Sequence, residues 1–232
     1  MLQVKQFRYH LDNLGYLLYG EKYAMAVDGG AFDEILSFAD SRRLSLLFVT
    51  NTHGHMDHTN GNATLLNEAN ARLLRYEEIR GTEIELEGQN IRIYDTPGHT
   101  ADSLCFHVGN ALITGDTLFN GTIGNCFSGD LKGFYQSIKK IMSLPGSTVI
   151  YAGHDYVQEA MSFARRLEPD NEYIKIFAKN YKQDHVFSRL MEELRVNPYL
   201  RFNEPGIINL LKKNGLPRKT EWQRWQSLMT ID

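Results

Sequence analysis

The sequence predicts an α+β protein in which a layered body of strands and helices is followed by a helical C-terminal appendage. Up to about residue 158, short β-rich runs alternate with stretches of helical periodicity. After that point the strand signals stop, and prolines lie between the helical stretches rather than inside them. We therefore expect two domains, comprising residues 1–158 and residues 159–232.

The individual elements follow from hydrophobic spacing and turn residues. Runs rich in Val, Ile, Tyr and Phe, several of them bounded by Gly or Asn, predict strands at residues 4–9, 16–19, 23–27, 46–50, 72–76, 83–86, 91–94, 104–108, 111–114 and 148–151. Apolar residues recurring every three or four positions predict helices at residues 32–43, 63–70, 131–144, 157–167, 172–183, 186–196, 207–214 and 220–229.

Composition excludes several classes of protein. A chain of 232 residues with 42% hydrophobic residues can bury a full core. With 25 basic and 28 acidic residues, it lacks the basic excess of a protein that binds nucleic acid by bulk charge. No apolar run is long enough to span a membrane, and the first residues lack the apolar stretch of a signal peptide. The two cysteines, Cys105 and Cys126, suit a reducing compartment, so we expect a cytoplasmic protein without a nucleic-acid or membrane partner.

The most informative motif is His-Gly-His-Met-Asp-His at residues 53–58, directly after the apolar run 46–49. Imidazole and carboxylate groups are ligands that zinc and similar divalent metals prefer. A strand that ends in a tight loop can turn alternate side chains toward one point. The alternative is a helix start with solvated histidines, where Asp57 only caps the helix. Four ionisable groups within six positions favour a metal site.

Three later segments also place a ligand-type side chain in the loop after an apolar strand, next to a glycine. His99 follows a Pro-Gly turn, and Asp116 and His154 each come directly after an apolar strand and a glycine. Each residue alone is more often an ordinary turn residue, but together they extend the metal constellation beyond a closed site of four ligands. The remaining histidines, His10, His107 and His185, lack this setting and are interpreted as structural or surface residues.

The order of these motifs across residues 50–156 resembles the metallo-β-lactamase superfamily. The segments Phe-Ala-Arg-Arg-Leu-Glu-Pro at residues 163–169 and Val-Asn-Pro-Tyr-Leu-Arg at residues 196–201 resemble its glyoxalase II branch, the hydroxyacylglutathione hydrolases. The resemblance implies a four-layer αββα sandwich with metals at one edge, between two sheets. Residues 1–158 would form the catalytic domain and residues 159–232 a helical substrate-binding domain.

The resemblance also implies two divalent metal ions per chain. It assigns His53, His55 and His99 to the first metal, Asp57, His58 and His154 to the second, and Asp116 to both. The expected nucleophile is a metal-bound hydroxide, with Asp57 and Asp116 as the catalytic side chains. Zinc is the expected metal, with iron or manganese as alternatives. Asp28 is expected either to orient ligands or to end a strand in a turn.

The expected substrate contacts depart from the family. Asn125 stands where the family commonly has Lys or Arg, and Phe127 where it often has Tyr. Tyr156 matches a position that contacts glutathione, or it is a packing residue. The pair Arg218-Lys219 either replaces the missing charge or forms a solvated helix start. We expect hydrolysis of a thioester, either an acyl-glutathione resembling S-lactoylglutathione or a thioester of a similar small thiol.

Four other functions remain open at this point. The persulfide dioxygenases are similar to this chain and use one iron, held at positions matching His53, His99 and Asp116, but they generally lack the long helical tail. A β-lactamase is a further reading, as is a nuclease, which should carry an added basic segment. A structural metal site would need only four ligands. The expected partner is a small molecule, and the expected assembly is a monomer or a small homo-oligomer.

Overall fold

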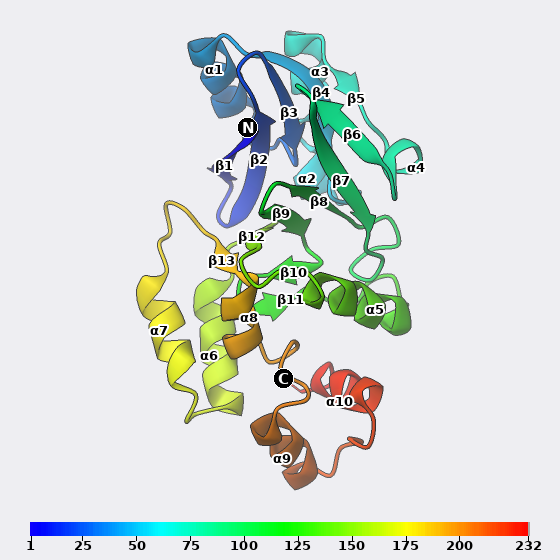
Figure 1. Cartoon of the computed structure of the whole chain (residues 1–232), viewed down its shortest axis with the longest axis vertical. Coiled ribbons are helices and arrows are strands. Elements are labelled where there is room, and N and C mark those ends of the chain that lie inside the picture. The colour runs from blue at the N-terminus through cyan, green and yellow to red at the C-terminus, as the bar shows by residue number, and fades with distance from the viewer. Residues whose placement is uncertain (232) are drawn as a thin grey trace.

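The computed structural model describes residues 1–231 as two facing β-sheets with helices on their outer faces (Figure 1). The first sheet has the order β1-β2-β3-β4-β5 and comprises β1 (Gln3–Tyr9), β2 (Asn13–Tyr19), β3 (Tyr23–Val27), β4 (Ser45–Thr50) and β5 (Arg72–Leu73). Strands β1 to β3 pair antiparallel, whereas β3, β4 and β5 pair parallel. Helices α1 (Phe32–Arg42), α2 (Met56–Thr59) and α3 (Asn62–Ala69) lie along the connections between the parallel strands.

The second sheet has the order β13-β12-β9-β8-β7-β6. Its strands are β6 (Glu83–Leu86), β7 (Gln89–Asp95), β8 (Leu104–Val108), β9 (Ala111–Gly115), β12 (Val149–Ala152) and β13 (Ser188–Arg189). Strands β9 and β12 are parallel, and the other neighbours are antiparallel. A small hairpin of β10 (Leu118–Phe119) and β11 (Thr122–Ile123) follows β9.

Side-chain alternation explains why the sheets stack face to face. In β2, Tyr16 and Leu18 lie in the core between the sheets, while Leu17 packs with residues of α1 and α3 on the outside. In β8, Phe106 faces the same inner core, while Cys105 packs on the opposite face. Because successive side chains of a strand point to opposite faces, each sheet buries both of its faces. The four-layer αββα sandwich expected from the sequence is therefore confirmed.

The C-terminal helices cover the second sheet and one end of the sandwich (Figure 1). The remaining helices are α4 (Tyr76–Ile79), α5 (Leu131–Met142), α6 (Val157–Leu167), α7 (Glu172–Asn180), α8 (Leu190–Val196), α9 (Pro205–Lys213) and α10 (Glu221–Leu228). The buried Trp225 of α10 meets Phe134 of α5, with ring centres 5.7 Å apart. Helix α6 reaches the inner core through Val157 and Met161. Among residues 1–231, no helix is both long and apolar enough to cross a membrane.

Most predicted elements are present with shifts of one or two residues, but two predictions are wrong. Strand signals do not stop at residue 158, because Ser188–Arg189 forms β13 and only Leu190–Val196 of the predicted helix 186–196 is helical. The predicted strand 72–76 is only two residues long, and Tyr76–Ile79 forms α4 instead. Short elements of this kind are decided by pairing partners distant in sequence. The predicted domain boundary falls inside α6, and the division into two domains stays a prediction.

Candidate metal centre

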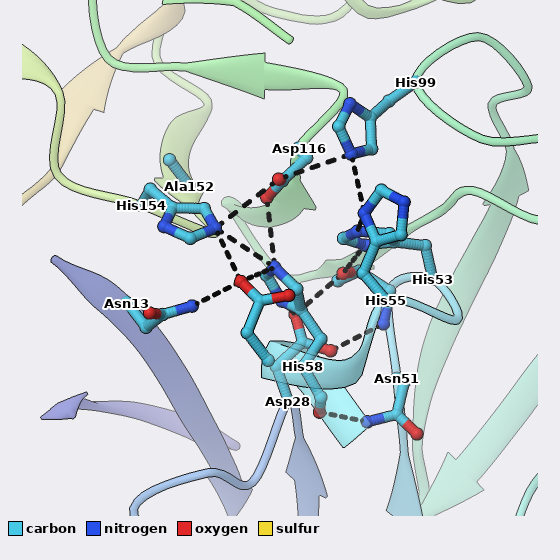
Figure 2. Close-up of polar contacts among 12 residues, drawn as sticks. Asn13, Asp28, Asn51, His53, His55, His58, His99, Asp116, Ala152 and His154 are labelled. Atoms are coloured by element: carbon cyan, nitrogen blue, oxygen red, sulfur yellow. Dashed lines mark hydrogen bonds and ion pairs between the residues drawn. The ribbon is translucent and has the colours of Figure 1, made fainter. Parts of the chain in front are cut away.

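The candidate site lies where strands of both sheets end at one edge of the sandwich. Strand β4 leads into the loop that carries His53, and β7, β9 and β12 lead into His99, Asp116 and His154. Strands β9 and β12 are parallel, and β7 runs in the same direction because two antiparallel pairings separate it from β9. Their C-terminal ends therefore meet at the same edge of the second sheet. We call the seven side chains gathered there the His/Asp cluster: His53, His55, Asp57, His58, His99, Asp116 and His154 (Figure 2).

One half of the cluster contains three imidazoles. The Nδ1 atom of His55 lies 2.8 Å from Nε2 of His53 and 3.1 Å from Nε2 of His99. His53 and His99 are buried and His55 is half-buried. These three residues are the set expected for the first metal, and their nitrogen atoms are close enough for one ion to contact all of them.

The other half contains two imidazoles and a carboxylate. Nε2 of His154 lies 3.2 Å from Nε2 of His58 and 3.3 Å from Oδ2 of Asp57. Asp57 and His58 share the short helix α2, whereas His154 arrives from the loop after β12. The structure thus brings together the three residues expected for the second metal.

Asp116 lies between the two halves (Figure 2). Its Oδ1 atom is 3.4 Å from Nε2 of His58, and its Oδ2 atom is 3.5 Å from Nε2 of both His99 and His154. Oδ1 is buried and has no hydrogen-bond partner among the described residues. A buried carboxylate oxygen without a donor is costly unless a cation satisfies it, so this position fits a group that faces two ions.

The ring nitrogens on the outer side of the cluster are held by oxygen acceptors. Nδ1 of His58 lies 2.9 Å from Oδ2 of Asp28, and Nδ1 of His154 lies 3.0 Å from Oδ1 of Asp12. His99 donates from Nδ1 to the carbonyl oxygen of Asn125 at 2.9 Å. These contacts place a proton on each Nδ1 and direct Nε2 inward as the atom that would bind a metal, the usual arrangement of a metal-binding histidine. The donor sets therefore fit divalent metal ions.

Asp28 connects several parts of the site. It has a φ of 54°, a left-handed conformation that Asp tolerates better than most residues. Its fully buried carboxylate accepts from the backbone N and the hydroxyl of Thr52, both at 2.7 Å, as well as from His58. The Thr52 hydroxyl in turn lies 3.1 Å from Nδ1 of His53. Asp28 thus orients residues in both halves of the cluster, in line with the supporting role expected for it.

Sequence reasoning missed several of these supporting groups. Asp12 lies in the turn between β1 and β2, and Asn13, the first residue of β2, donates to Oδ2 of Asp57 at 2.9 Å. The hydroxyl of Tyr9 donates to the backbone oxygen of Asp57. The sequence pattern around these residues indicates only a strand and a hairpin turn, and no regular spacing relates them to the histidine motif.

Burial and neighbouring charges shift the pKa values of the cluster members in different directions. Burial lowers the pKa of His53 far below its usual value and that of His99 to about 4, so both are neutral ligands at pH 7. Burial also acts to lower the pKa of His58, but the carboxylates of Asp28, Asp116 and Asp57 together outweigh it and raise that pKa to about 9. Burial raises the pKa of Asp116 to about 6. Metal binding at His58 therefore has to release a proton.

Small residues make the crowded strand ends possible. A Cβ atom at Gly153 would lie 2.2 Å from Oδ1 of Asp116, so any side chain there would collide with the cluster. Gly115 has a φ of 50°, and a Cβ atom there would lie 2.4 Å from Oγ1 of Thr52. The glycine that precedes His154 is thus required by the close approach of Asp116, and the glycine that precedes Asp116 by the close approach of Thr52.

The predicted substrate residues lie in different places. The Tyr156 ring stacks on His154 with ring centres 5.1 Å apart, and the exposed Phe127 ring lies 5.2 Å from His99 and 5.9 Å from His55. Asn125 is exposed, and its backbone oxygen rather than its side chain contacts the cluster. The predicted pair at residues 218–219 lies in the loop between α9 and α10. The substrate roles of all these residues stay predictions.

Comparison with known proteins agrees with this geometry. Residues 13–95 and 73–154 match the family model of the metallo-beta-lactamase superfamily, and residues 155–229 match the model of the hydroxyacylglutathione hydrolase C-terminus. The hydroxyacylglutathione hydrolase of Idiomarina loihiensis is 32% identical over 204 residues, which cover 81% of each chain. That of Pseudoalteromonas translucida is 31% identical over 233 residues, covering 92% of this chain and 90% of its own.

A solved structure of ETHE1 from Myxococcus xanthus superimposes with a TM-score of 0.69, over 99% of this chain and 92% of that chain. Its sequence identity is 21%, so this likeness shows the fold alone. The family models together span most of the chain, and the curated relatives exceed 30% identity over more than two thirds of it. The chain therefore belongs to the hydroxyacylglutathione hydrolases, a family of hydrolases within the metallo-β-lactamase superfamily.

Proposed function

We propose that this protein is a binuclear metal-dependent thioester hydrolase that acts on an acyl-glutathione or on a thioester of a similar small thiol. The observation that carries the proposal is the pair of three-ligand sets on either side of Asp116. The names of the curated relatives support the same reaction class.

The proposed ligands follow the two halves of the His/Asp cluster. One ion would be held by His53, His55 and His99, the other by Asp57, His58 and His154, with Asp116 shared between them. When bound, two such ions supply Lewis acidity that polarises the substrate carbonyl and makes a water molecule acidic. We propose zinc as the metal, because it suits nitrogen and carboxylate ligands and has no redox chemistry to interfere with hydrolysis.

The side chains around the cluster contribute orientation and charge. Asp28 and Asp12 hold the outer nitrogens of His58 and His154, so their Nε2 atoms stay directed inward. Asp116 supplies a negative charge between the two positions, which reduces the repulsion between two cations. The thiol of the product has an ordinary pKa near 8.5, so it leaves as a thiolate without a dedicated proton donor.

A persulfide dioxygenase is the alternative, and the second ligand set argues against it. A single iron at His53, His99 and Asp116 would leave Asp57, His58 and His154 without a function. Yet the Nε2 atoms of His58 and His154 lie 3.2 Å apart, and outer acceptors hold both rings. Such convergence is expected for metal ligands and is costly otherwise, since buried polar atoms need partners. We also propose a cytoplasmic location, because both cysteines are free thiols.

The test is purification without added metal, followed by elemental analysis and assays on a panel of thioesters. We expect about two metal ions per chain and release of free thiol with water as the only co-substrate. His58→Ala and His154→Ala should each lose about one ion and most of the activity. Full activity with one ion, unchanged in both variants, would contradict the proposal. Oxygen uptake with glutathione persulfide would establish the dioxygenase instead.

A further inference from the structure

A pocket of about 250 Å³ lies beside the His/Asp cluster and contains none of its members. It is lined by Thr122, Tyr156, Glu159, Ala160, Phe163 and Tyr199. Tyr156 forms the wall nearest to the cluster, because its ring stacks on His154 at an interplanar angle of 3°. The pocket lies between α6 and the hairpin β10–β11 on one side and the segment after α8 on the other. Tyr156 thus contacts the cluster and also lines the pocket.

The lining of this pocket has the chemistry of a cation site. Three aromatic rings contribute to it, and those of Phe163 and Tyr199 are stacked with centres 6.1 Å apart. The single charged side chain in the lining is Glu159. Its carboxylate is exposed on α6 and forms no ion pair or hydrogen bond with the residues that the structure describes. Aromatic faces together with a carboxylate attract ammonium groups, and quaternary ammonium ions in particular.

The same lining is poorly suited to a thiol portion that carries a net negative charge. It contains no Lys or Arg, and the stretch from Asp116 to Asp130, which includes Asn125 and Phe127 at the mouth of the site, is also free of basic residues. The nearest guanidinium described against these rings, that of Arg166, lies 5.4 Å from the Phe163 ring centre and does not line the pocket. Glutathione carries two carboxylates and one ammonium group, so its net charge is negative, and the charge of Glu159 disfavours it relative to a cationic thiol.

We propose that this pocket binds the thiol portion of the substrate and that it selects a thiol whose arm ends in an ammonium group without a carboxylate. The inference rests on the proposed thioester hydrolysis and chooses among the thiols that the proposal leaves open. Glu159 pairs with the ammonium group, and the rings of Tyr156, Phe163 and Tyr199 surround its apolar substituents. Hydrolysis itself is unchanged: the C–S bond breaks, a C–O bond forms with water, and the thiol is released.

The test compares three thioesters with the same acetyl group and different thiol charges. Acetylthiocholine is cationic, S-acetyl-N-acetylcysteamine is neutral and S-acetylglutathione is net anionic. On the metal-loaded protein we expect kcat/KM for acetylthiocholine to exceed that for S-acetylglutathione by about fivefold, the size of one exposed ionic contact. Glu159→Lys should reverse this order. Glu159→Gln should raise KM for acetylthiocholine by about two- to fivefold and leave kcat and the neutral thioester unchanged.

Control variants and a binding measurement make the outcome decisive. Glu172→Gln makes the same change on exposed helix α7, where the carboxylate pairs with Lys175, and should leave all three substrates unaffected. Phe163→Leu should weaken acetylthiocholine alone, by about two- to fivefold. Choline, which has no thioester, should bind the wild type in an NMR titration and fail to bind Glu159→Lys.

Two failures can be told apart. Equal or better turnover of S-acetylglutathione, or an order of substrates that Glu159→Lys does not change, would overturn the pocket assignment and leave thioester hydrolysis intact. If the metal-loaded protein cleaves none of the three thioesters, the proposed function is wrong. The choline titration then still decides the pocket, since absence of binding to the wild type refutes a cation site.

Discussion

Replacing Glu193 by Gln should remove a pH dependence of stability that originates far from the His/Asp cluster. Glu193 is fully buried on α8. Its carboxyl oxygens accept from the backbone N of Gly121 at 2.9 and 3.1 Å, from the Ser188 hydroxyl at 2.7 Å and from the Asn197 amide at 3.0 Å. The side chain thereby joins α8 to the hairpin that follows Asp116. All of its partners donate, so a Gln amide nitrogen there would meet a donor.

The magnitude follows from proton linkage. Burial raises the pKa of Glu193 from 4.5 to about 7, even though its hydrogen-bond donors act in the opposite direction. Between these values the folded protein keeps the proton that the unfolded chain has lost. The stabilisation is therefore complete below about pH 4.5 and is lost as the pH rises through 7. Integrated from about pH 5 to about pH 8.5, this loss is about 2.5 kcal/mol. The Gln variant lacks it and carries a pH-independent cost of about 1–3 kcal/mol for the mismatched amide.

The measurement is urea unfolding of the wild type and Glu193→Gln at a series of pH values, with the same metal content. Groups that titrate elsewhere contribute equally to both proteins, so their contributions cancel in the difference between the two unfolding free energies. We expect the advantage of the wild type to shrink by about 2.5 kcal/mol from about pH 5 to about pH 8.5. Glu192→Gln, one residue earlier, serves as control and should show a constant difference. A Glu193→Gln difference that varies by less than about 0.5 kcal/mol over this range would refute the reasoning.

Three further predictions concern the site. Asp116→Ala should lose both metal ions and most of the activity, because its two carboxylate oxygens face both halves of the cluster; retention of one ion with normal turnover in elemental analysis and assay would show that it is not shared. Asp28→Asn should weaken metal binding by about 10- to 100-fold in a chelator competition, since the Asp28 carboxylate orients His58. An unchanged metal affinity would exclude that role. Asn125→Lys should lower KM for a glutathione thioester by about fivefold with kcat nearly unchanged, because the backbone oxygen that holds His99 is retained; an unchanged KM would show that residue 125 does not face the glutathione carboxylates.

The layered architecture and the cluster of ligand-type side chains could both be predicted from the sequence. Strand β3 and helix α6 coincide with their predicted ranges because turn residues and proline-bounded periodicity are local signals. The members of the His/Asp cluster could be found because each lies in a segment that follows an apolar strand, and strand ends gather at a sheet edge. The motif at residues 53–58 already determines part of the geometry, since the short segment formed by the loop after β4 and helix α2 carries four of the seven side chains.

Tertiary structure alone decided the groups that hold the cluster in place. Asp12 reaches His154 across 142 residues of sequence, Asn13 reaches Asp57 across 44, and the carbonyl of Asn125 reaches His99 across 26. Hydrogen bonds of this kind depend on how two sheets and their loops pack. Because every residue has a backbone carbonyl, the residue type does not indicate which carbonyl will hold a histidine. The same holds for β13, two residues that become a strand only because the edge of β12 is available to pair with them. Local periodicity specifies elements, whereas the packing of distant segments specifies the second layer of contacts on which the orientation of the imidazoles depends.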